Sequence, residues 1–64
     1  MFRAGDRVRL LKAREGFGIG AEGVVRRVDS SGNLIVSLDR DADGTVLDPP
    51  QPLLPHEPED FETI

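Results

Sequence analysis

Apolar and polar residues alternate along several short stretches of the chain, which is the pattern of a β-strand with one buried face. In the segment DRVRLL, Val8 and Leu10 alternate with Arg7 and Arg9. The spacing predicts a strand that directs the valine and leucine into the core and the two arginines toward the opposite face.

Two further apolar runs are joined by a stretch of turn-forming residues, 29–33 (DSSGN), so they predict a β-hairpin with a loop of about five residues. The first run, GVVRRVD, is rich in valine, whose branched side chain fits a pleated surface. In the second run, alternate positions separate into a core face and an outer face. We expect the core face to hold Leu34, Val36 and Leu38 and the outer face to hold Ile35 and Ser37.

The remaining chain supplies a wide glycine-rich loop after Lys12, a short strand at 45–47 and then a proline-rich segment, in which regular structure is expected to stop. Leu53 and Leu54 are expected to form a last short strand or a 3₁₀ turn. The fold predicted is therefore all-β, a small five-stranded antiparallel SH3-like barrel over residues 1–54. Residues 55–64 are predicted to be an acidic, partly disordered tail that Phe61 or Ile64 could hold in place.

The segment Gly18–Gly23 (GIGAEG) fits the G-x-G-x-x-G pattern of phosphate-binding loops. In a dinucleotide-binding fold this pattern opens a helix, whereas here it leads into a predicted strand. A chain of 64 residues is also too short for a βαβ sheet or a two-lobed kinase. We therefore expect no nucleotide site, and Gly20 and Gly23 are interpreted as positions where a small, strongly bent sheet needs glycine.

Candidate catalytic and metal-ligating groups are few. The chain has no cysteine and a single histidine, His56, in the proline-rich segment, and the aspartates at 39, 41 and 43 do not have the spacing of a calcium loop. No nucleophile has an evident base beside it. The sequence therefore predicts a protein that is not an enzyme and that has no catalytic residues, no cofactor and no metal.

No segment has the composition of a signal peptide, and no apolar run approaches the ~20 residues that span a bilayer. A cytoplasmic protein without a membrane partner is expected. The net charge of −4 is divided unevenly. Residues 1–28 carry seven Arg or Lys against three acids, and residues 29–64 carry nine acids against Arg40 alone.

With the strands placed, GDRVRLL and GAEGVVRRVDSSGNLIVSL resemble small bacterial SH3-like barrels. These include the KOW-type domains, the barrel subunits of photosynthetic electron-transfer complexes and the nitrile hydratase β-subunit barrel. The resemblance covers about residues 3–54 and rests on positions that make the fold, so it implies architecture rather than activity. The matching positions are Gly5, Asp6, Val8, Leu10, Gly20, Gly23, Val25 and Val28.

The type II dihydrofolate reductases also resemble this chain, through GDRVR and through residues 44–50. Leu47, Asp48 and Pro49 stand where that family has the Gln-Ile-Tyr that binds folate and nicotinamide. A leucine and a proline cannot make the hydrogen bonds of a glutamine and a tyrosine. An oligomeric reductase of this kind is therefore the least favoured alternative.

The function predicted is a protein-interaction or accessory-subunit module that self-associates, because apolar residues on a loop or an outward strand face indicate a covered surface. The predicted partner-binding residues are Phe17, Ile19, Val24 and Ile35.

The alternative is a KOW-like RNA- or DNA-binding module, disfavoured by the acidic net charge, that uses the basic strands. Its residues would be Arg7, Arg9, Lys12, Arg14, Arg26 and Arg27, although adjacent Arg26 and Arg27 would point to opposite faces of a regular strand. Prolines at 49, 52, 55 and 58 also suit either a polyproline ligand or a rigid connector.

Overall fold

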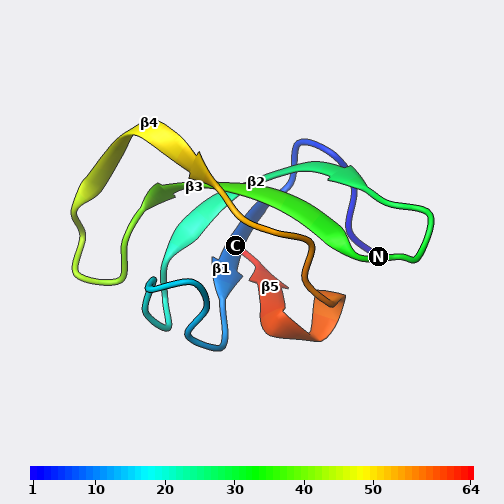
Figure 1. Cartoon of the computed structure of the whole chain (residues 1–64), viewed down its shortest axis with the longest axis horizontal. Coiled ribbons are helices and arrows are strands. Elements are labelled where there is room, and N and C mark those ends of the chain that lie inside the picture. Colours follow the sequence, from blue (N-terminus) through cyan, green and yellow to red (C-terminus); the bar gives the residue numbers. More distant parts are fainter.

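The computed structural model describes residues 1–64 as one five-stranded antiparallel sheet (Figure 1). No helix has the length and apolarity needed to cross a bilayer. The strands lie in the order β4-β3-β2-β1-β5, so the last strand lies beside the first. This confirms the all-β, antiparallel prediction, but β4 and β5 are not paired with each other, so the sheet is not closed into a barrel. The elements are β1 (Arg7–Leu10), β2 (Glu22–Val28), β3 (Leu34–Arg40), β4 (Val46–Pro52), the 3₁₀ turn η1 (Pro58–Asp60) and β5 (Phe61–Thr63).

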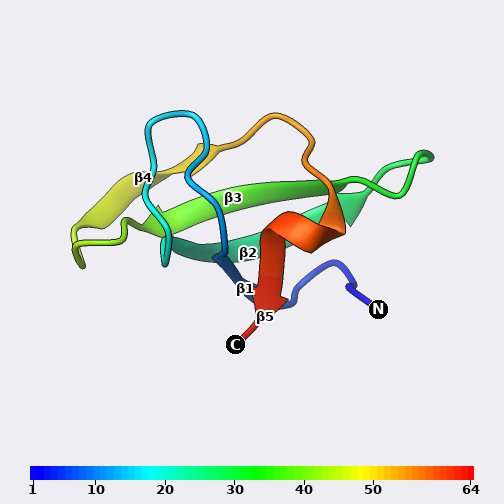
Figure 2. The same cartoon turned by 90° about the horizontal axis from the view of Figure 1, so that it is seen from below.

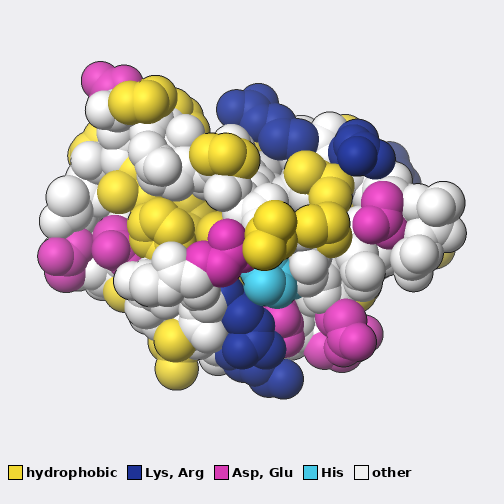
Figure 3. Space-filling model, viewed as in Figure 1, with side chains coloured by type: hydrophobic (Ala, Val, Ile, Leu, Met, Phe, Trp, Pro, Cys, Tyr) yellow, Lys and Arg dark blue, Asp and Glu magenta, His cyan; other side chains and the backbone are white.

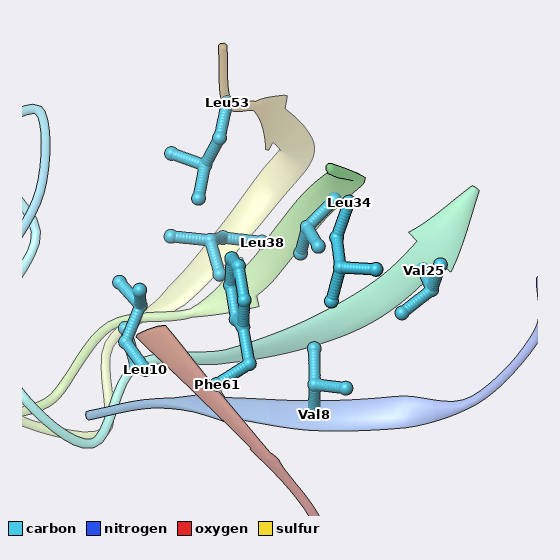
Figure 4. Close-up of a cluster of buried hydrophobic side chains, with 9 residues drawn as sticks. Val8, Leu10, Val25, Leu34, Leu38, Leu53 and Phe61 are labelled. Carbon is cyan, nitrogen blue, oxygen red and sulfur yellow. The ribbon is translucent and has the colours of Figure 1, made fainter. Parts of the chain in front are cut away.

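The core lies on one face of the sheet and receives side chains from four strands. Figure 4 shows Phe61 and Leu53 directed toward the leucines and valines of β1, β2 and β3. The alternation predicted for β1 and β3 is confirmed, since every predicted inward residue is at most 1% exposed. The nine core residues are Val8, Leu10, Ala21, Val25, Leu34, Val36, Leu38, Leu53 and Phe61.

The β2–β3 hairpin closes as predicted, and the side chain of Asp29 organises its turn. One carboxylate oxygen of Asp29 accepts the backbone N–H groups of Ser31 and Asn33, each at 2.9 Å. Gly32 has a φ of 84°, which an L side chain rarely adopts. An aspartate that caps its own turn therefore fixes the end of the hairpin.

A β-bulge interrupts β2 shortly before this turn. Val25 pairs with Val36 and Arg27 pairs with Ile35, so Arg26 is an extra residue in the ladder. The regular alternation ends there, and Arg26 and Arg27 are both exposed. Unbroken alternation from Val25 would put Val28 on the outer face, but the bulge pairs it with Leu34 and so turns it to the core face. At the end of the strand Val28 is still 42% exposed.

The proline-rich segment is not the end of regular structure that the sequence predicted. β4 continues through Pro49 and Pro50 to Pro52, pairing irregularly with β3. Prolines are tolerated because β4 is an edge strand, whose outer side needs no N–H donor. Since Pro49 and Pro52 belong to β4 and Pro58 begins η1, the regularly spaced prolines do not form one polyproline helix.

The packed structure also extends past the predicted boundary at residue 54. Residues 61–63, expected in a partly disordered tail, form β5 and pair with β1 through Leu10↔Phe61 and Val8↔Thr63. Phe61 is 4% exposed, so its burial and the backbone pairing hold the C-terminal segment. Leu53 enters the core without belonging to a strand or 3₁₀ turn, whereas Leu54 is 68% exposed.

Gly23 occupies a position in β2 where β3 approaches too closely for a side chain. A Cβ built there would lie 2.2 Å from the backbone oxygen of Ser37, which cannot move without disturbing the ladder. The contact explains why the last glycine of GIGAEG is needed for the sheet.

We expect Gly23→Ala to lower the free energy of unfolding by about 3 kcal/mol or more, because overpacking against backbone is costly. That is most of the stability of a domain of this size, about 3–5 kcal/mol. Gly32→Ala is the control, since its Cβ meets nothing within 4 Å and only the positive φ is unfavourable. Its expected cost is about 1–2 kcal/mol. Urea denaturation measures both, and equal losses would contradict the steric explanation.

Candidate protein-binding surface

The N-terminal arm, residues 1–6, is hydrogen-bonded to the middle of β2, at the residue before the bulge. Gly5 N–H donates to the Val25 carbonyl at 2.7 Å, and Val25 N–H donates to the Asp6 carbonyl at 2.9 Å. Residues 3–6 form a tight turn, in which Arg3 N–H donates to the Asp6 carboxylate at 2.9 Å. The arm therefore lies beside the part of β2 that contains the bulge.

The C-terminal segment is hydrogen-bonded to the start of β3, on the side of β3 that faces away from β2. Leu34 N–H donates to the His56 carbonyl at 2.8 Å, and His56 N–H donates back to the Leu34 carbonyl at 3.2 Å. This isolated bridge brings the segment before η1 alongside the hairpin. Figure 2 shows the N-terminal arm, the β2–β3 turn and η1 at the same end of the sheet.

An apolar pocket of about 370 Å³ lies among these three elements. Phe2 packs against the core from the arm, and Leu34 links the pocket to the buried cluster. Val28, which the bulge places on the same face of the sheet as Leu34, contributes from β2. The lining residues are Met1, Phe2, Val28, Gly32, Leu34 and Pro58.

Charges of both signs lie next to the pocket in the chain and make no ion pair or side-chain hydrogen bond. On the arm and β2 they are Arg3, Arg26 and Arg27, and on the segment 57–59 they are Glu57 and Glu59. Arg27 pairs with Ile35, so its side chain lies on the outer face of the sheet. All five side chains are exposed. The space-filling view shows cationic side chains toward the top of this end of the molecule, and anionic ones both beside them and toward the bottom (Figure 3).

Elsewhere the basic N-terminal half is neutralised by the acidic C-terminal half. Arg7 donates to both carboxylate oxygens of Asp39, at 2.7 and 3.0 Å, and lies 3.5 Å from Glu22. The hydrogen bond from Arg7 holds the pKa of Asp39 below its usual value. Arg9 lies 3.6 Å from Glu62, so the two arginines of β1 are both paired.

The Asp60 carboxylate neutralises two more cations at the base of the long loop. Arg14 donates to its oxygens at 3.0 and 3.3 Å, and Lys12 lies 3.5 Å away. Asp60 is 5% exposed, and the hydrogen bond from Arg14 is the main cause that lowers the pKa of its carboxyl. Of the six cations in the predicted nucleic-acid surface, only Arg26 and Arg27 are therefore free of carboxylates.

The four predicted partner-binding residues lie in different environments. Phe17 is half-buried and packs against the core, so it is not the exposed loop residue that the sequence suggested. Ile19 is 66% exposed on the same loop. Val24 and Ile35 are half-buried on the outer face of β2 and β3.

The glycine-rich loop is held in a defined shape. Arg14 and Phe17 exchange backbone hydrogen bonds around a two-residue turn, whose central residues Glu15 and Gly16 have φ values of 53° and 85°. Positive φ at both positions is the requirement of a type I′ turn. The Glu15 carboxylate accepts hydrogen bonds from Leu54 N–H, at 3.0 and 3.3 Å, and contacts His56 Nε2.

This contact was not predicted, because Glu15 and His56 are distant in sequence and neither belongs to a motif. The contact with Glu15 engages Nε2 of the only histidine in the chain. Glu15 lies at Nε2 of the ring, whereas the Asp60 carboxylate is 3.9 Å from Nδ1, so the two carboxylates lie against different ring nitrogens. No group of three or more His, Asp or Glu side chains is arranged to hold a metal ion.

Comparisons with known proteins found no family model, curated protein or solved structure that matches this chain.

The paired Asp60 carboxylate predicts acid sensitivity. A carboxyl whose pKa is lowered in the folded state contributes stability that is present above its unfolded pKa, about 3.9, and is lost as pH falls through the folded pKa. We expect Asp60→Asn to lower stability at pH 7 by about 1–3 kcal/mol and to reduce the dependence of stability on pH below about 4.

The matched control is Asp39→Asn, which removes the more exposed pair with Arg7 and is expected to cost about 0–1 kcal/mol. Denaturant unfolding over a pH series measures both variants. An unchanged pH dependence in Asp60→Asn would contradict the assignment.

Proposed function

We propose that the chain is a non-enzymatic protein-interaction or accessory-subunit module, built on an SH3-like fold, that binds its partner at the apolar pocket beside the β2–β3 turn. The observation that carries the proposal is the contrast in charge pairing. The cations of β1 and the long loop have carboxylate partners. The charged residues within two positions of a pocket residue in the chain that have none are Arg3, Arg26, Arg27, Glu57 and Glu59. An apolar surface rimmed by unpaired polar groups is typical of a protein-binding site.

The SH3-like part of the proposal is supported by the five-stranded antiparallel sheet and by the last strand returning beside the first. Glycine positions in the resemblance also have structural reasons, as at Gly23. The positions of these residues add no support for a reductase, because Leu47 packs against the core and Asp48 and Pro49 lie in edge strand β4.

A second candidate function is nucleic-acid binding, which the unpaired Arg26 and Arg27 favour. Its surface would be smaller than the six-residue patch expected from the sequence. Phe2 and Phe17 are half-buried and Phe61 is buried, so they offer little exposed ring for stacking on bases. The protein-binding proposal is preferred because it also uses the apolar pocket.

Site-specific photocrosslinking tests the pocket. A benzophenone amino acid placed at Val28, which lines the pocket, is expected to form a discrete protein adduct in cells that produce the protein. The matched control is Val46, an exposed valine on β4, which should form none. Unlabelled wild-type protein should compete for the adduct, and Val28→Asp should not, because a charge in the pocket disfavours apolar contact. Equal labelling at both positions, or none, would count against the proposal.

Retention of the protein on immobilised RNA or DNA tests the second candidate function, nucleic-acid binding. If the arginines bind phosphates, affinity should fall steeply with salt and should be lost in Arg26→Glu/Arg27→Glu. Arg9→Glu, which removes a cation already paired with Glu62, should then have a smaller effect. No retention at low salt would remove the nucleic-acid candidate.

A further inference from the structure

We infer that the outer edge of β4 and the residues that follow it, 50–54, form a second docking site, which fits a partner protein whose groove is lined by tryptophan or tyrosine. The inference goes beyond the proposed function, because no residue of this edge lines the pocket beside the β2–β3 turn. It depends on the backbone groups that the edge exposes, on the proline rings beside them and on the absence of tryptophan and tyrosine from the chain.

The peptide groups of this edge point alternately toward β3 and away from the sheet. Leu53 N–H donates to the Val36 carbonyl at 2.9 Å, so the backbone of Leu53 faces β3. In an antiparallel ladder the N–H and C=O of the neighbouring residues point the other way. Those of Pro52 and Leu54 therefore lie on the free side, and the same alternation places the carbonyl of Pro50 there. Figure 1 shows that no further strand lies beyond β4.

The free side of this edge accepts hydrogen bonds and offers no donor. Pro50 and Pro52 each have a carbonyl but no N–H. The N–H of Leu54 is occupied, because it donates to the Glu15 carboxylate at 3.0 and 3.3 Å. A partner that binds here must therefore bring its own donors and finds none to accept from.

The proline rings supply an exposed apolar surface next to these carbonyls. Pro52 pairs with Ser37, so its ring lies on the outer face of the sheet, and the ring of Pro50 lies two positions away on the same face. Both prolines are exposed. The pyrrolidine ring fixes φ near −65°, close to the value of a polyproline II helix. The segment is thus already ordered, and binding costs little conformational entropy.

Aromatic side chains that carry a polar hydrogen match this edge. The indole N–H of tryptophan and the phenol O–H of tyrosine donate hydrogen bonds from rings that also pack on apolar surfaces. Grooves lined by aromatic residues bind proline-rich segments in this way. An edge that combines proline rings with free carbonyls therefore fits a groove of this kind.

Other partners do not match the edge. An added β-strand needs donors as well as acceptors, and the edge offers only acceptors. A nucleic acid would bring negative phosphates, which accept hydrogen bonds, against carbonyl oxygens. A second copy of the chain has neither tryptophan nor tyrosine with which to form the groove. The partner at this edge is therefore a different protein.

Titration of the chain into a WW domain and into a eukaryotic SH3 domain tests the inference, since both kinds of domain bind proline-rich segments in aromatic-lined grooves. The chain contains no tryptophan, so tryptophan fluorescence reports on the probe domain alone. This fluorescence should change saturably. Amide NMR of the isotope-labelled chain should show shifts at Ser37, Gln51 and Leu53, whereas the amides of Val28 and Gly32 at the pocket should not move.

Two substitutions separate the edge from exposed proline in general. Pro52→Ala removes a ring and adds an outward N–H that the groove leaves without an acceptor, so binding should weaken by about tenfold or more. Pro55→Ala is the matched control at an exposed proline after the edge, and it should bind as the wild type does. Replacing the groove tryptophan of the probe by phenylalanine keeps an aromatic ring but removes the donor, and should also weaken binding.

No saturable change with either probe at about 1 mM of the chain would overturn the inference, since a complex with a dissociation constant near that value would be detected. Binding that shifts Val28 and Gly32 instead of the edge, or that is unchanged in Pro52→Ala, would overturn it too. The crosslinking test at the pocket is decided separately, because its control residue, Val46, lies about 13 Å along β4 from Pro50.

Discussion

The pairing of β1 with two strands from opposite ends of the chain is the constraint on which the rest of the structure depends. Its four residues pair with β2 on one side and with β5 on the other. This brings the acidic C-terminal segment against the basic N-terminal strands. Arg9 then meets Glu62, and the cations that follow β1 meet Asp60.

The same constraint explains why the charge asymmetry of the sequence is not visible as two opposed surfaces. A basic half and an acidic half suggested either docking between molecules or neutralisation within one. Neutralisation dominates wherever β1 and β5 are neighbours. Residues outside that neighbourhood, Arg26 and Arg27 at the bulge and Glu57 and Glu59 around η1, keep their charges available. The candidate surface is therefore defined by the charged residues that no internal ion pair neutralises.

Sequence patterns predicted the parts of the fold that rest on regular alternation. Val8, Leu10, Leu34, Val36 and Leu38 were assignable to the core because the period of two has a direct geometric meaning.

The bulge at Arg26 was not predictable, because nothing in the local sequence marks an inserted residue. The start of β4 was predicted as a short strand at 45–47, but its continuation through the prolines and the whole of β5 were missed, for different reasons. Proline statistics describe central strands rather than edges, and β5 has three residues stabilised by distant partners.

The candidate surface was less accessible to sequence reasoning than the fold. Phe17 and Ile19 drew attention as apolar residues on a flexible-looking loop, but the type I′ turn and the Glu15 contacts give that loop a fixed path, and Phe17 turns toward the core. The pocket joins Met1 and Phe2 with Pro58, almost the full length of the chain apart. Arg26 and Arg27 were identified from the sequence among six cations, but that these two lack carboxylate partners depends on the contacts of the other four with Asp39, Asp60 and Glu62.

The proline-rich edge strand bears on how this small protein avoids aggregation. An open sheet has two edges whose unpaired N–H and C=O groups can recruit further chains without limit. Pro49, Pro50 and Pro52 remove donors from the β4 edge, and β5 offers only three residues at the other edge. Sheet extension is therefore disfavoured at both ends. A chain protected in this way can expose an apolar pocket at its surface and still not grow into a fibre by adding strands at its edges.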